Sequence, residues 1–150
     1  MKKFLIPLMI LLFMNCGSDD SVKDFTAANE EEILEYTSAQ GLNAQRSDSG
    51  LYYIINEAGS GSSPAASSNV TVAYRGYFTD GTVFDESNSE GISFDLSGVI
   101  AGWTEGITYF NEGGSGILLI PSRLAYGTRG RSGIPGGAVL IFDITLISVN

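Results

Sequence analysis

A single tryptophan strongly constrains how this chain of 150 residues can fold. Trp103 lies in a short run, residues 102–107, and Trp103, Ile107 and Phe110 recur at the spacing of one helical face. A helix this short is not stable alone, because most helical stability in proteins comes from packing of an apolar face. The segments on either side are rich in β-forming residues. We therefore expect this helix to lie against a curved apolar sheet.

Five segments have the composition or the alternation of β-strands: residues 51–57, 69–78, 82–85, 115–121 and 138–149. The Asp80-Gly81 pair between the second and third segments is a hairpin signal. The last segment is apolar on both sides through much of its length, which predicts a central strand. The predicted fold is therefore α+β, with a curved antiparallel sheet of about five strands wrapped around one short helix and an N-terminal helical extension.

The start of the chain has the pattern of a secretory signal peptide, because Lys2 and Lys3 precede an uncharged apolar run over residues 4–14. This run is shorter than the roughly 20 residues that a helix needs to span a bilayer. Cys16 follows after Asn15, and the whole resembles a bacterial lipoprotein signal, in which the cysteine is lipidated and becomes the mature N-terminus. The alternative is an incidental cysteine. We expect residues 1–15 to be the signal peptide.

Residues 16–49 are predicted to be a lipidated tether followed by a helical extension. Residues 25–41 have the pattern of a helix that Thr26 or Asn29 can cap. Its apolar residues form only a narrow stripe: Ile33, Leu34 and Tyr36. The helix is therefore a packed arm, a dimer contact or a mostly solvated spacer. Residues 42–50 have the composition of a polar linker.

Composition and charge exclude several kinds of chemistry. The chain has no His and one Cys, so it can form no histidine metal site, no His-based acid–base pair, no zinc-binding Cys cluster and no internal disulfide. Its formal net charge of −9 at pH 7 disfavours nucleic-acid binding and is typical of a soluble surface. We expect no metal and no cofactor.

Five short motifs follow one another along the chain: Val-Ala-Tyr-Arg-Gly at 72–76, Asp-Gly-Thr-Val-Phe-Asp at 80–85, Val-Ile-Ala-Gly-Trp-Thr-Glu-Gly at 99–106, Ile-Pro-Ser-Arg-Leu-Ala-Tyr-Gly at 120–127 and Leu-Ile-Phe-Asp at 140–143. In type, order and most spacings they resemble the FK506-binding protein (FKBP) family of peptidyl-prolyl cis-trans isomerases. The resemblance runs from about Gly50 to Val149, and we take residues 50–150 as the isomerase domain.

The resemblance implies a shallow apolar pocket with Trp103 as the floor beneath a proline ring. Four residues would carry catalysis: Asp85, Tyr126, Trp103 and Ile100, the last through its backbone N–H. Six would bind substrate: Tyr74, Phe84, Phe94, Val99, Ile134 and Phe142. Asp85 would orient Tyr126 or polarise the pocket. The long loop that carries Ile134 is one residue shorter here than the family pattern.

The implied activity is rotation of X–Pro bonds in exported proteins, driven by the apolar pocket and by hydrogen bonds to the twisted amide. The alternative is a non-catalytic FKBP-fold chaperone or partner-binding lipoprotein. Expected partners are proline-containing polypeptide clients, macrolide inhibitors such as FK506 or rapamycin, and a membrane reached through the lipid on Cys16. The expected location is the cell envelope of a bacterium, on the outer membrane and facing the periplasm or the surface.

Overall fold

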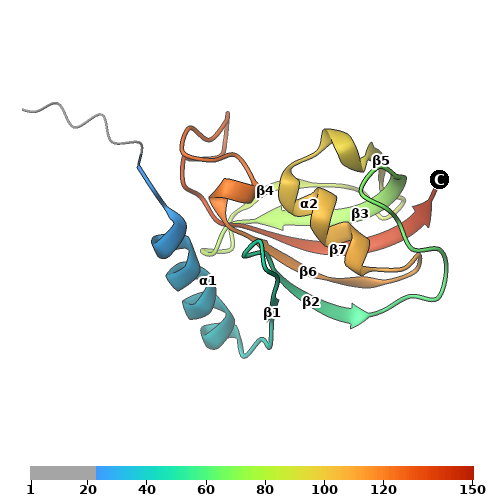
Figure 1. Ribbon diagram of the computed structural model, residues 1–150, viewed down its shortest axis with the longest axis horizontal. Helices are drawn as coiled ribbons and strands as arrows, with labels where there is room; N and C mark the ends of the chain where they lie inside the picture. The colour runs from blue at the N-terminus through green and yellow to red at the C-terminus, as the bar shows by residue number, and fades with distance from the viewer. Residues whose placement is uncertain (1–22) are drawn as a thin grey trace, which may run out of the picture.

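The structure is a computed structural model, and it describes residues 23–150. A seven-stranded sheet dominates it, with strand order β1-β2-β6-β7-β3-β4 and with β5 also paired to β3 (Figure 1). The strands are β1 (Gln45–Arg46), β2 (Tyr52–Glu57), β3 (Asn69–Tyr77), β4 (Val83–Glu86), β5 (Ile92–Asp95), β6 (Ser115–Ile120) and β7 (Leu140–Val149). Every pairing is antiparallel, as predicted.

The sheet contains the five predicted strands and two more, β1 and β5. β7 lies between β6 and β3, which confirms the prediction that the last strand is central. Alternation along β6 and β7 divides the core into two clusters on opposite faces of the sheet. One face packs around Trp103 and includes Leu118 and Phe142, whereas the other packs around Ile33 and includes Leu119.

The predicted short helix is α2 (Ala101–Gly106), which lies across the sheet and continues into a 3₁₀ turn, η2 (Ile107–Tyr109) (Figure 1). Trp103, Ile107 and Phe110 are all buried, as their spacing predicted. Gly102 allows the helix to approach β6 closely, because a Cβ atom there would lie 2.5 Å from Cγ2 of Ile120. The helix that carries Trp103 is therefore set against the sheet with no room between them.

The N-terminal extension differs from the prediction in its capping and in its linker. Helix α1 (Thr26–Gln40) begins with Asp24 Oδ1 accepting the Thr26 N–H at 2.9 Å, so neither Thr26 nor Asn29 caps it with its side chain. Asn29 is instead 2% exposed and bonds elsewhere. Of the three alternatives for this helix, the packed arm is observed, because Ile33 is fully buried against the sheet. The linker contains strand β1, since Arg46 pairs with Tyr52.

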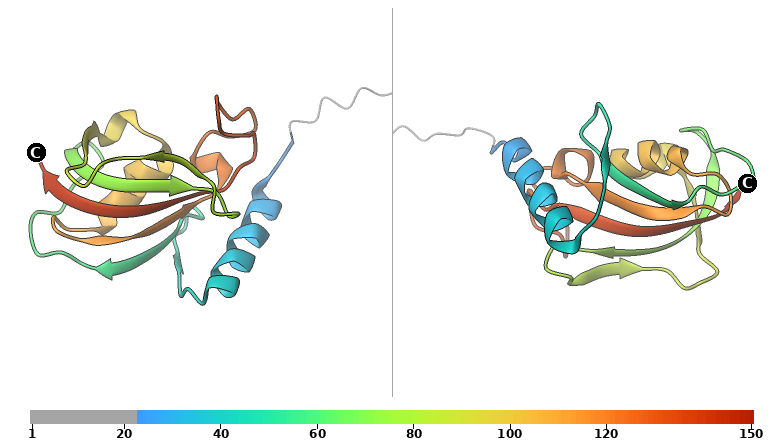
Figure 2. Two further views of the ribbon diagram at one scale, coloured as in Figure 1. Left: turned by 180° about the vertical axis from the view of Figure 1, so that it is seen from behind. Right: turned by 90° about the horizontal axis from the view of Figure 1, so that it is seen from below.

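Figure 2 shows α1 beside one end of the sheet, where β6 ends and β7 begins. The segment between these strands begins with a 3₁₀ turn, η3 (Ser122–Leu124), and a further turn, η1 (Leu96–Gly98), precedes α2. The predicted signal peptide and the predicted lipidation site, Cys16, lie outside the described residues. Within residues 23–150, no helix combines the length and the apolar character needed to cross a bilayer.

Candidate functional site

One pocket of about 710 Å³ lies beside the start of α2, between strands β4 and β5 and the segment that joins β6 to β7. The structure places around it every predicted site residue within the described part of the chain: Tyr74, Phe84, Asp85, Phe94, Val99, Ile100, Trp103, Tyr126, Ile134 and Phe142. These residues come from seven segments of the chain. Such convergence of aromatic walls with a few polar groups is typical of a small-ligand site.

Trp103 lies at the base of this pocket and is only 4% exposed. The rings of Tyr74, Phe94 and Phe142 pack against it with centroid separations of 5.1, 5.2 and 5.3 Å and interplanar angles of 86°, 77° and 81°. Near-perpendicular contacts at this distance are favourable between aromatic rings. The indole N–H has no hydrogen-bond partner among residues 23–150, so packing fixes the orientation of the ring.

Gly76 on β3 makes room for two aromatic side chains of the pocket wall. A Cβ atom at this position would lie 2.7 Å from Cζ of Phe84 and 2.8 Å from Cε1 of Phe142. These two rings meet edge to face, with centroids 5.5 Å apart and an interplanar angle of 89°. Because Gly76 has no side chain, β4 and β7, which lie on either side of β3, contribute adjoining parts of one wall.

Asp85 contacts a different tyrosine from the one expected. Its Oδ2 accepts a hydrogen bond from the Tyr74 hydroxyl at 2.7 Å. Burial raises the pKa of Tyr74, and the hydrogen bond to the Asp85 carboxylate raises it further. The predicted orientation of Tyr126 by Asp85 is therefore not observed. Asp85 instead holds Tyr74, which is a wall residue in contact with Trp103.

Tyr126 is oriented by Arg131, a residue that the sequence reasoning missed. Arg131 Nη1 donates to the Tyr126 hydroxyl oxygen at 3.1 Å, and its guanidinium carbon lies 5.0 Å from the ring centroid. Because the hydroxyl accepts from Arg131, its own hydrogen is left for an acceptor in the pocket. The loop has no periodicity that would place Arg131 beside Tyr126, so local sequence carried no signal for this contact.

Ile100 has extended backbone angles, φ −57° and ψ 147°, and its carbonyl accepts the N–H groups of Trp103 and Thr104 at 2.9 and 3.1 Å. The N–H of Ile100 itself takes part in none of the backbone hydrogen bonds between described residues. Ile100 itself lines the pocket. No group of three possible metal-ligating side chains occurs within residues 23–150.

A second hollow, of about 550 Å³, lies on the other face of the sheet. Of the predicted site residues only Tyr74 touches it, and most of the residues that form it are polar, Arg75, Asn88 and Asp143 among them. It has no aromatic floor. The pocket over Trp103 is therefore the candidate site.

The family model for FKBP-type peptidyl-prolyl cis-trans isomerases matches residues 61–147. The isomerase FkpA of Escherichia coli is 43% identical over 127 residues, which cover 82% of this chain and 47% of the relative. FkpA of Aeromonas hydrophila is 39% identical over 125 residues, or 81% of this chain and 47% of the relative. The chain thus spans about half the length of these curated relatives.

Two crystal structures have similar folds. That of Escherichia coli FkpA superposes with a TM-score of 0.74 at 42% identity, covering 83% of this chain and 60% of the other. That of a peptidyl-prolyl isomerase from Pseudomonas syringae superposes with a TM-score of 0.72 at 30% identity, covering 83% of this chain and 96% of the other. Family model, relatives and aromatic pocket agree, and the chain belongs to the FKBP-type peptidyl-prolyl cis-trans isomerase family.

Proposed function

We propose that this protein is a peptidyl-prolyl cis-trans isomerase that accelerates rotation about X–Pro bonds in exported proteins. The observation that carries the proposal is the pocket over Trp103, which combines an apolar floor and walls with two polar donors at its edge. An aromatic, apolar floor suits the apolar ring of a proline. The donors, the Ile100 N–H and the Tyr126 hydroxyl, are both available to a peptide carbonyl.

The reaction needs no nucleophile, because no bond is broken. Rotation of the amide faces a barrier of about 18–20 kcal/mol, since the planar bond has partial double-bond character. The planar amide is more charge-separated than the twisted one, so apolar walls disfavour the planar ground state relative to the transition state. A ~10⁵-fold acceleration corresponds to about 7 kcal/mol, which desolvation, fixed orientation and one or two hydrogen bonds together can supply.

Most site residues have a distinct role in this scheme. Trp103, Phe94, Phe84 and Phe142 surround the ring of the substrate proline. The Ile100 N–H anchors a carbonyl of the bound peptide, and Tyr126, held by Arg131, donates from the edge. Asp85 acts by fixing Tyr74, whose ring packs against Trp103.

An exchange assay on a short X–Pro peptide, by NMR or coupled to a protease, tests the proposal. We expect a rate clearly above the uncatalysed one, and kcat/KM should fall in the order wild type, Asp85→Asn, Asp85→Ala. Asp85 is exposed, so both variants should keep nearly the full melting temperature. Val83→Ala is the matched control, because Val83 lies two residues away on the same strand and outside the pocket. A folded wild-type protein without activity would refute the isomerase function, and the non-catalytic binding or chaperone function would then remain.

The location of the protein is part of the proposal. The basic start, the apolar run over residues 4–14 and Cys16 support export and a lipid anchor in the cell envelope. Mass spectrometry of the mature N-terminus should find residues 1–15 absent and acyl chains on Cys16. A mature chain that begins elsewhere or carries a free thiol would rule out the anchor. Macrolides such as rapamycin should bind the pocket and change the fluorescence of Trp103.

A further inference from the structure

Residues 122–137, which make up most of the segment between β6 and β7, form one wall of the pocket. We call these residues the rim loop. It contributes Tyr126, Arg131 and Ile134 to the pocket lining. Several backbone hydrogen bonds hold it internally: Arg131 and Ile134 bond each other in both directions at 2.9 Å, and Gly127 donates to Ser122 at 2.8 Å and accepts from Gly137 at 2.9 Å. Apart from η3 the loop has no helix or strand, and loops of this length are costly to order, so contacts from outside the loop add to its conformational stability.

A single side chain of the N-terminal arm joins the two ends of the rim loop. Asn29 Oδ1 accepts hydrogen bonds from Ser122 N at 2.8 Å and from Ser122 Oγ at 2.7 Å. Asn29 Nδ2 donates to the carbonyl of Gly137 at 2.9 Å. Ser122 and Gly137 are the first and last residues of the loop. Asn29 and Ser122 are only 2% and 4% exposed, so water does not replace these bonds.

Packing holds the arm in the position that these bonds require. Ile33, one turn along α1, is fully buried in the cluster on the face of the sheet opposite Trp103. Phe25 fits against Gly137 so closely that a Cβ atom there would lie 2.3 Å from its ring. Gly137 has φ of 79°, a value that favours glycine, so a side chain is doubly disfavoured at this end of the loop.

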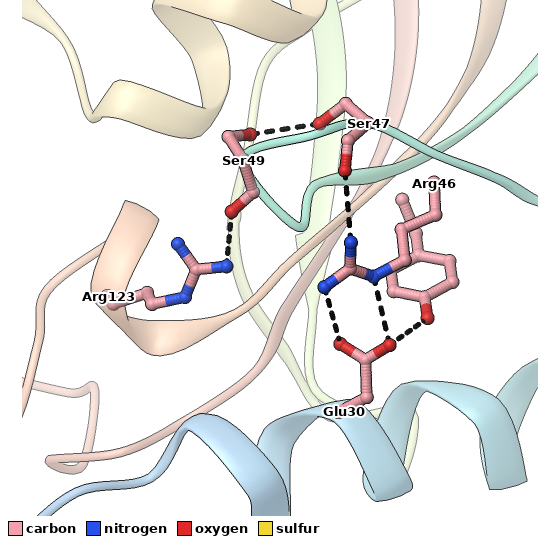
Figure 3. A network of polar contacts seen from close by, with 6 residues as sticks. Glu30, Arg46, Ser47, Ser49 and Arg123 are labelled. Carbon is pink, nitrogen blue, oxygen red and sulfur yellow. Dashed lines mark hydrogen bonds and ion pairs between the residues drawn. The ribbon is translucent and has the colours of Figure 1, made fainter.

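Polar contacts also connect α1 and the rim loop with β1 and the residues that follow it (Figure 3). Glu30 on α1 forms a salt bridge of 3.0 Å with Arg46 on β1, and Arg46 also donates to the Ser47 carbonyl at 3.3 Å. Arg123 in the rim loop donates to the Ser49 carbonyl. The Ser49 hydroxyl also bonds to Glu105, two residues from Trp103 on α2. The arm is thus linked to both the floor and the rim of the pocket.

We infer that Asn29 is a positioning residue for the isomerase site, through which α1 holds the rim loop in the conformation that presents Tyr126 and Ile134 to a ligand. The inference rests on the proposed function for its effect on catalysis. If loss of Asn29 leaves the loop in this conformation one-tenth of the time, the apparent affinity for a pocket ligand falls about tenfold.

The test compares full-length wild type, Asn29→Ala, Ser122→Ala and Ile33→Val. Ser122→Ala removes one of the three hydrogen bonds, whereas Ile33→Val reduces the packing of α1 and leaves all three in place. Three quantities are measured under conditions where each variant is folded: kcat/KM on an X–Pro peptide, the Kd of rapamycin from Trp103 fluorescence, and backbone amide exchange over residues 126–134.

For Asn29→Ala we expect about tenfold weaker rapamycin binding, a similar fall in kcat/KM and faster amide exchange confined to the rim loop. Ser122→Ala should give smaller changes in the same direction, and it keeps the test decisive if Asn29→Ala does not fold. Ile33→Val should stay within twofold of wild type in all three. The inference is overturned if Asn29→Ala matches wild type, or if Ile33→Val loses as much.

Failure of the proposed function is distinguishable from failure of this inference. A wild-type protein without isomerase activity would refute the function alone. In that case, the amide exchange of the rim loop in Asn29→Ala still decides whether Asn29 holds the loop.

Discussion

Replacing Gly102 with Ala tests whether the contact between α2 and β6 sets the position of Trp103. A Cβ atom at this position would lie 2.5, 2.9 and 3.1 Å from three side-chain carbons of Ile120. Favourable carbon–carbon contacts lie at about 3.5–4.0 Å, so the overlap is on the order of 1 Å. Ile120 is fully buried and cannot swing into solvent. The helix must therefore move away from the sheet and carry the indole with it.

Two opposing effects set the magnitude. Overpacking of a core costs about 1–3 kcal/mol, and Ala gains about 1 kcal/mol over Gly in a helix. Because three carbons are affected at once, we expect the steric cost to prevail and the free energy of unfolding to fall by about 1–2 kcal/mol. Catalysis should fall further, since misplacement of a site by about 1 Å can cost up to ~100-fold in rate.

The assay is urea unfolding, followed by Trp103 fluorescence, for wild type, Gly102→Ala, Ile120→Ala and the double variant. Ile120→Ala alone should cost about 2–5 kcal/mol by leaving a cavity. The loss in unfolding free energy of the double variant should be smaller than the sum of the two single losses by about 1–2 kcal/mol, because the new methyl group occupies the space that Ile120 vacates. If Gly102→Ala is as stable as wild type and the two effects add, the close contact does not exist and the reasoning is refuted.

Gly76→Ala should push Phe84 and Phe142 apart, because its Cβ atom would lie 2.7 Å from the first ring and 2.8 Å from the second. We expect a loss of about 1–3 kcal/mol in unfolding free energy and weaker rapamycin binding, and unchanged binding in a fluorescence titration would contradict this. Glu105 should contribute to stability at neutral pH and less in acid. Burial of Glu105 favours a higher pKa, but the hydrogen bonds from Ser49, Tyr109 and Ser47 outweigh it, and the pKa of Glu105 is lower than its ordinary 4.5. Because the pKa of Glu105 is lowered in the folded state, its contribution to stability is present above pH 4.5 and is lost as the pH falls through the folded-state pKa. Between pH 7 and pH 3, the urea midpoint of Glu105→Gln should therefore decline less steeply than that of wild type. Equal slopes would contradict the assignment.

The elements that sequence predicted well are those with strong local signals. β3 alternates with period two and is followed by Asp80-Gly81, so both the strand and the turn after it follow from local rules. β5 carries only four residues between Gly- and Ser-rich stretches, and its pairing with β3 is a tertiary contact without a local signature. β1 is two exposed polar residues long. No local rule would identify it as a strand.

The site shows the same division between local and tertiary information. The order of the motifs predicts that the aromatic residues line one pocket, and in the structure they do so. The partners of their polar atoms could not be predicted this way. Asp85 pairs with Tyr74 across two strands, and its partner depends on strand register. The local pattern allows Thr26 or Asn29 to cap α1, but the side chain of Asn29 instead makes tertiary bonds to Ser122 and Gly137.

The place of β7 in the sheet has a consequence for how the protein is made. β7 is the last described element to leave the ribosome, yet it pairs along most of its length with both β3 and β6, joining Val70 to Val149 at one end. Until it arrives, the two halves of the sheet have no common neighbour, and the wall that Phe142 supplies is absent. Contacts so distant along the chain form slowly, because a long loop must close first. The pocket can therefore assemble only after synthesis of residues 23–149 is complete, and a chain that stops short of β7 has no finished site.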